Sequence, residues 1–111
     1  MDLLTQDWFI LQDPAAPGEH IVMESVGLKL SPMWTSGLEA ELFAGNPAAQ
    51  GMLVQKLDTP TLKESYLLAL GMLGVERVLV GYQVGMPDAQ GMDLETALRL
   101  IRRQLEPLGP S

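Results

Sequence analysis

His20 is the only histidine of this 111-residue chain, and so the only side chain whose ordinary pKa lies near neutral pH. Glu24 follows four residues later, and in an extended strand residues at that spacing point to the same face. Such a pair is the beginning of a metal site, or a general base beside an acidic neighbour. A metal site needs further ligands that the sequence does not identify, and a lone histidine next to a turn is more commonly a surface residue. We therefore expect no metal ligands and no catalytic residues.

The usual catalytic and phosphate-binding motifs are absent from the sequence. No serine lies in a G-x-S-x-G or S-x-x-K pattern. The eleven glycines form neither G-x-G-x-x-G nor G-x-x-x-x-G-K. The lack of cysteine excludes disulfides, thiolate metal sites and cysteine catalysis. The sequence predicts a protein that is not an enzyme and that has no cofactor.

Four apolar residues at the boundaries of predicted elements are the candidates for binding. Met33 and Trp34 precede a predicted helix, and Met86 and Met92 flank a loop expected at 85–92. Tryptophan is favoured at protein interfaces, and exposed methionines form deformable contact surfaces. Both residue types also fill cores, so the alternative is an architectural role. We predict that Met33, Trp34, Met86 and Met92 form a binding surface.

The charge of the chain is −7 and is unevenly distributed. Residues 1–50 carry seven acids and one base, whereas residues 51–111 carry seven acids and six bases. This acidity disfavours nucleic acid and anionic membranes as partners and attracts a basic protein, although solubility alone would also explain it. No apolar run approaches the roughly 18 residues of a membrane helix, and no leader-like segment opens the chain. We expect a cytoplasmic protein of bacterial type.

Hydrophobic spacing and chain-breaking residues predict the elements that must position these residues. Strands are expected at 7–12, 19–30, 52–57 and 76–84. Helices are expected at 37–44, 60–73 and 94–108, with Thr35 or Ser36, Asp58 or Thr59, and Asp93 as their N-terminal caps. In the first helix, Leu38, Leu42 and Phe43 are expected to form one apolar side.

The order β-β-α-β-α-β-α predicts a single α+β domain over residues 1–111. It favours a three- or four-stranded mixed sheet with the helices packed mainly on one face. Strands 7–12 and 19–30 are expected to form an antiparallel hairpin around the Pro/Gly-rich loop 13–18, with Gly27 as a bulge or break. Strands 52–57 and 76–84 are expected to be parallel neighbours joined through the second helix.

Several short stretches resemble a known family. "DWFILQD", then "LSPMWTS" followed by "EAE", and the strand–helix tail resemble the small bacterial proteins of domain of unknown function 2750. They are also similar to the N-terminal part of the enhanced-serine-sensitivity, or SseB-like, proteins. The resemblance runs from about Asp7 to Leu105, and its most distinctive residues are Pro32, Trp34, Ser36 and Ala40. It implies an α+β fold and supplies no catalytic residues. Some related small acidic domains resemble toxin-neutralising immunity proteins.

Together these features predict a non-catalytic protein-interaction module that self-associates as a homodimer. An immunity-type inhibitor of a basic toxin is the first alternative. The second is a small metal-binding protein or enzyme built on His20 with Glu24.

Overall fold

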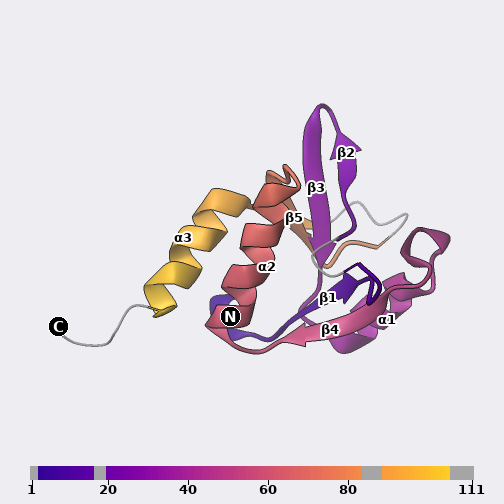
Figure 1. Cartoon of the computed structure of the whole chain (residues 1–111), viewed down its shortest axis with the longest axis horizontal. Coiled ribbons are helices and arrows are strands. Elements are labelled where there is room, and N and C mark those ends of the chain that lie inside the picture. The colour runs from indigo at the N-terminus through magenta and orange to yellow at the C-terminus, as the bar shows by residue number, and fades with distance from the viewer. Residues whose placement is uncertain (1–2, 17–19, 84–88, 106–111) are drawn as a thin grey trace, which may run out of the picture.

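The computed structural model describes residues 3–16, 20–83 and 89–105, and within these ranges the chain forms three α-helices and six strands (Figure 1). The strands are β1 (Trp8–Gln12), β2 (Met23–Ser25), β3 (Leu28–Met33), β4 (Leu53–Leu57), β5 (Arg77–Val80) and β6 (Gln90–Asp93). The helices are α1 (Gly37–Ala44), α2 (Pro60–Met72) and α3 (Leu94–Leu105), and short 3-10 turns span Leu3–Thr5 and Pro47–Ala49. The predicted α+β class and element order are confirmed. The second predicted strand is divided into β2 and β3, and β6 is an additional strand between β5 and α3.

Each helix begins at a residue that the sequence marks as a cap. The Ser36 hydroxyl accepts from the Glu39 N–H, and the Thr59 hydroxyl accepts from the Leu62 N–H. The Asp93 carboxylate accepts from both the N–H and the hydroxyl of Thr96, which lowers the pKa of Asp93. Because these bonds satisfy N–H groups that the first turn leaves unpaired, the helix starts are fixed locally.

The strands form two sheets, and Phe9 and Trp34 bridge them. Strands β1 and β4 form an antiparallel ribbon, and the other sheet has the order β2-β3-β5-β6. At the junction, the Phe9 N–H donates to the Trp34 carbonyl at 2.6 Å, and the Trp34 N–H donates to the Phe9 carbonyl at 2.9 Å. This reciprocal pair connects the ribbon to the end of β3.

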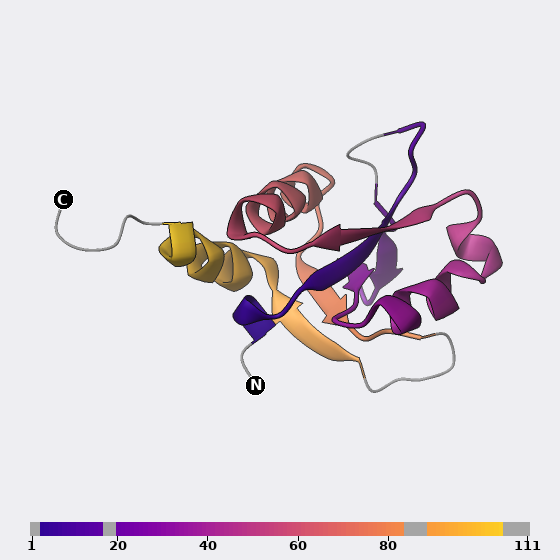
Figure 2. The same cartoon turned by 90° about the horizontal axis from the view of Figure 1, so that it is seen from below.

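Strand β1 separates two hydrophobic cores. Successive side chains of a strand point to opposite faces, so Trp8 and Ile10 face one core while Phe9 and Leu11 face the other. The first core lies towards α2 and α3, and the second lies towards α1. Figures 1 and 2 show α1 on the opposite side of β1 from the other two helices. Two helices therefore share one face, and α1 covers the other.

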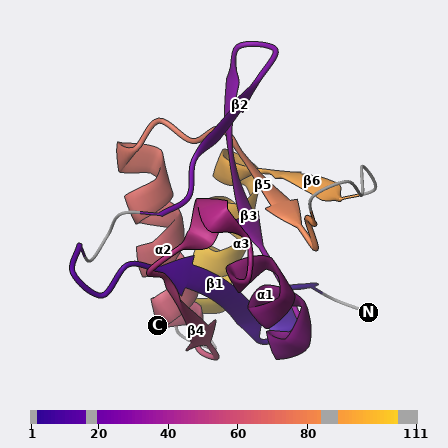
Figure 3. The same ribbon diagram turned by 90° about the vertical axis from the view of Figure 1, so that its right-hand side faces the viewer.

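The pairing predicted for the first two strands is wrong. Strand β1 pairs with β4, in a register that places Trp8 opposite Leu57. Residues 23–33 instead fold back on themselves, because Val26 and Gly27 adopt positive φ angles of 53° and 80° and form a two-residue turn. Gly27 is thus the hairpin turn, not a bulge. The β2–β3 hairpin projects beyond the rest of the molecule (Figures 1 and 3).

The parallel pairing predicted between strands 52–57 and 76–84 is also wrong. Strand β5 runs parallel to β3, with Val78 opposite Ser31, while β4 belongs to the other sheet. The Glu76 N–H bonds to the Lys29 carbonyl and the Gly81 N–H to the Met33 carbonyl, so the ladder is bonded at both ends. Residues 90–92, expected in a loop, belong to β6 and pair antiparallel with β5.

No helix in the described parts of the chain combines the length and apolar character that crossing a membrane requires.

Replacing Trp34 by alanine should lower the free energy of unfolding by about 3–5 kcal/mol, because it removes a fully buried ring and the hydrogen bond from its indole N–H to the Tyr82 carbonyl. Urea unfolding followed by circular dichroism measures the change. The matched control is Leu38→Ala, which alters an exposed residue and should stay within about 0.5 kcal/mol. A cost below about 1 kcal/mol for Trp34→Ala would contradict its place in the core.

Candidate functional site

Two of the four residues predicted to form a binding surface lie in the interior of the protein. Met33 and Trp34 are both 0% exposed. As consecutive residues at the end of β3 they point into opposite cores, Met33 towards α2 and α3 and Trp34 towards α1. The Trp34 indole N–H donates to the Tyr82 carbonyl at 2.8 Å. The prediction of an exposed binding role is therefore wrong for these two residues, which belong to the hydrophobic cores.

Of the two loop methionines, the structure describes only Met92. Met92 is half-buried in β6, where it lies opposite Val78 and packs against the first core. Met86 lies outside the described residues.

The predicted pairing of His20 with Glu24 rested on one continuous strand. Residues 20–22 lie before β2 and outside its ladder, so the two side chains do not share a strand face. Glu24 is exposed and lies opposite Lys29. Among the described residues, no group of three or more histidine, aspartate or glutamate side chains is placed to hold a metal ion.

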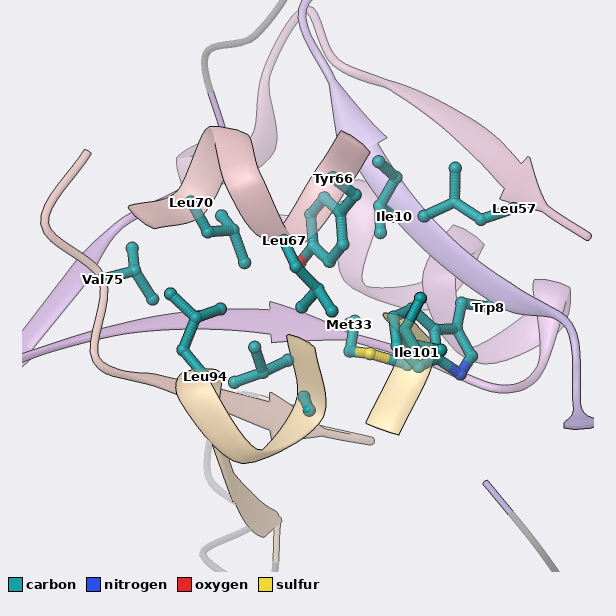
Figure 4. Packing of buried hydrophobic residues seen from close by; sticks show 12 residues of the cluster. Trp8, Ile10, Met33, Leu57, Tyr66, Leu67, Leu70, Val75, Leu94 and Ile101 are labelled. Atoms are coloured by element: carbon teal, nitrogen blue, oxygen red, sulfur yellow. The ribbon is translucent and has the colours of Figure 1, made fainter. Parts of the chain in front are cut away.

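His20 instead lines a hollow of about 200 Å³ between β1, β4 and α2. Its apolar walls are Ile10, Leu57, Leu62, Tyr66 and Ala69, and its polar lining is Gln12, His20, Gln55 and Ser65. Figure 4 shows Ile10, Leu57 and Tyr66 gathered at one end of the first core, away from Val75 and Leu94. The hollow therefore lies where this core reaches the surface. We call it the His20 pocket.

The imidazole of His20 is held against the ring of Tyr66. The two ring centroids are 5.1 Å apart and the planes meet at 89°, an edge-to-face contact. The Nδ1 atom is buried without a hydrogen-bond partner among the described residues. Burial lowers the pKa of His20, and this effect outweighs the opposing influence of the Leu11 backbone. Burial therefore favours the neutral form of the imidazole.

The tyrosine is positioned from two elements. Its hydroxyl lies 3.5 Å from the Pro32 carbonyl in β3, and hydrogen bonding with Ser31 partly offsets the rise in the pKa of Tyr66 that burial causes. The Ser31 hydroxyl in turn donates to the Ile21 carbonyl at 2.7 Å. These contacts connect α2 and β3 to the segment that carries His20.

The polar groups in the described lining of the pocket can all take part in hydrogen bonds. Its described lining offers an imidazole, two carboxamides and hydroxyl groups, but no carboxylate to orient the imidazole and no cation to stabilise developing charge. General acid–base catalysis needs a positioned partner as well as a usable pKa.

A second surface feature lies on α1, and it corrects the predicted apolar side of that helix. Phe43 and Ala40 face the second core, whereas Leu38 and Leu42 are 84% and 68% exposed. Helix α1 is thus apolar on its outer as well as its inner side. We call Leu38 and Leu42 the outer leucine pair.

Sequence reasoning missed Lys63, a buried cation on the core side of α2. Its ammonium group donates to the Gln6 carbonyl at 2.6 Å and lies 5.0 Å from the centre of the Trp8 ring. The helical spacing indicates this burial, because Lys63 precedes the buried Tyr66 and Leu67 by three and four residues and so lies on the same face of α2.

The elements and their pairing define a small α+β protein. Residues 5–98 match the family described as "Protein of unknown function (DUF3234)", and the chain belongs to that family. This overturns the resemblance to domain of unknown function 2750, which is a different family. A search of curated proteins found no match.

The histidine gives the stability a specific pH dependence. Since the folded-state pKa of His20 is lowered, the unfolded chain binds the proton first as pH falls through about 6.5, so the folded state loses stability below that pH. His20→Gln removes this proton uptake. Urea unfolding at pH 8 and pH 5 should show a larger loss for the wild type than for the variant, with carboxylate effects common to both. Equal losses would contradict a desolvated imidazole.

Proposed function

We propose that this protein is a non-catalytic protein-binding module and that the outer leucine pair of α1 is its contact surface. The main observation in support is that two large leucines, one helical turn apart, are exposed on a helix whose other side is already buried. Exposed apolar residues at i and i+4 are the usual anchors of a helix that docks into a groove.

The charges beside the pair support a partner with basic groups. At 100° per residue, Glu39 and Glu41 fall on either side of the line through Leu38 and Leu42, and both glutamates are exposed. An apolar centre with charged flanks is the ordinary arrangement of a protein contact surface. The complementary surface is an apolar groove flanked by lysine or arginine.

The same charges argue against a symmetric contact between two copies of α1. Such a contact places the glutamates of both copies around one cluster of leucines, and like charges in an interface are costly. The proposed partner is therefore a different protein, which replaces the homodimer expected from the sequence.

A photoreactive phenylalanine analogue at position 42 tests the contact. In extracts of the source cells it should cross-link one specific protein, and the same analogue at Met72 should not. Position 72 is the matched control because Met72 is 90% exposed on α2 and has an exposed leucine, Leu68, one turn before it. Cross-linking from position 72 alone, or cross-linking to a second copy of the chain, would contradict the proposal.

The purified partner then provides the quantitative measurement. Leu38→Ala with Leu42→Ala should raise the Kd at least tenfold, about 1.4 kcal/mol, because each buried leucine contributes about 1.5–3 kcal/mol. Added salt should weaken binding by screening the glutamates. Both leucines are exposed, so the unfolding midpoint of the variant should match the wild type. An unchanged Kd would place the interface elsewhere.

A further inference from the structure

The His20 pocket has features that neither the fold nor the outer leucine pair explains. It opens at the end of the first core, and its apolar walls give way to two glutamines. Along the α2-facing side of β1 the residues run Trp8, Ile10 and Gln12, and along β4 they run Leu57 and Gln55. The apolar surface therefore ends in carboxamides.

The size of the hollow limits what it can hold. At about 200 Å³ it exceeds the roughly 150 Å³ cavity that accommodates benzene in a protein core. Ile10, Leu57, Leu62 and Ala69 supply apolar contacts for one ring or a short branched chain. The ring of Tyr66 is already in contact with His20.

The charge of the lining limits the ligand further. The described lining residues carry no formal charge, although the chain has a net charge of −7. Burying an unpaired ion in such a pocket is costly, whereas a neutral polar group can pair with the amides. Gln12 and Gln55 each offer both hydrogen-bond donors and an acceptor, and Ser65 adds a hydroxyl.

We propose that the His20 pocket binds an uncharged molecule the size of a single ring, with a carboxamide or similar group that both donates and accepts hydrogen bonds. The apolar body packs against Ile10, Leu57 and Leu62, and the polar end pairs with Gln12, Gln55 and Ser65. This inference does not depend on the partner proposed for α1, which lies on the other side of β1.

Three probes of nearly the same shape test the proposal: benzamide, benzoate and benzamidinium. Because His20 is the only histidine, its imidazole ¹H–¹⁵N signals report on the pocket without ambiguity. Benzamide should shift these signals saturably with a Kd of about 1 mM or below, and both ions should bind at least tenfold more weakly. No saturable shift, or equal shifts with all three probes, would overturn the proposal.

Two variants connect binding to the named side chains. Ala69→Leu places three further carbons at the wall of the hollow and should abolish the benzamide titration, whereas Met72→Leu on exposed α2 surface should leave it unchanged. Gln55→Glu puts a carboxylate on an exposed lining position and should reverse the preference, so that benzamidinium binds better than benzamide. An Ala69→Leu protein that folds and still binds benzamide would place the site elsewhere.

Discussion

The two reciprocal hydrogen bonds between Phe9 and Trp34 are the constraint on which the rest of the structure depends. They are the point at which the β1–β4 ribbon and the four-stranded sheet join into one surface. Residues directly opposite in an antiparallel pair point to the same face. Phe9 and Trp34 therefore both enter the core beneath α1, and their neighbours Trp8 and Met33 both enter the core beneath α2 and α3. One backbone junction thus assigns four large side chains to two cores.

Burial on both faces of β1 has consequences for the polar groups around it. The Trp8 indole N–H donates to the Leu3 carbonyl at 3.0 Å, and the Lys63 ammonium lies over the same ring while it bonds to the Gln6 carbonyl. These contacts fasten the segment before β1 to α2. On the other side, the Trp34 indole holds the Tyr82 carbonyl after β5. Each tryptophan therefore fills a core and ties a neighbouring segment to it, because a buried indole N–H needs an acceptor.

The candidate sites lie where these cores end. On the α2 side, the β1–β4 ribbon extends beyond the part that α2 covers, and its residues there include Gln12 and Gln55. The His20 pocket lies at this place. On the α1 side, an eight-residue helix buries Ala40 and Phe43 and leaves Leu38 and Leu42 outside. The pocket and the leucine pair differ in chemistry. The pocket is concave and uncharged in its described lining, and the pair lies on a helix surface between two glutamates.

The sequence by itself determined the helices, the fold class and the element order. The caps at Ser36, Thr59 and Asp93 act within four residues of chain, and local signals of this kind can be read without knowing the fold. Strand partners, the inner side of α1 and the burial of Met33 and Trp34 were decided only by tertiary structure. Any apolar strand can pair with several others, and a leucine on a helix is buried only if something packs against it. The stretch with Pro32, Trp34 and Ser36 suggested the wrong family, because a short local pattern such as a helix cap can occur in many folds. The local sequence pattern is compatible with several arrangements of the strands and helices. Contacts between residues distant in sequence, such as Phe9 with Trp34 and His20 with Tyr66, determine which one forms.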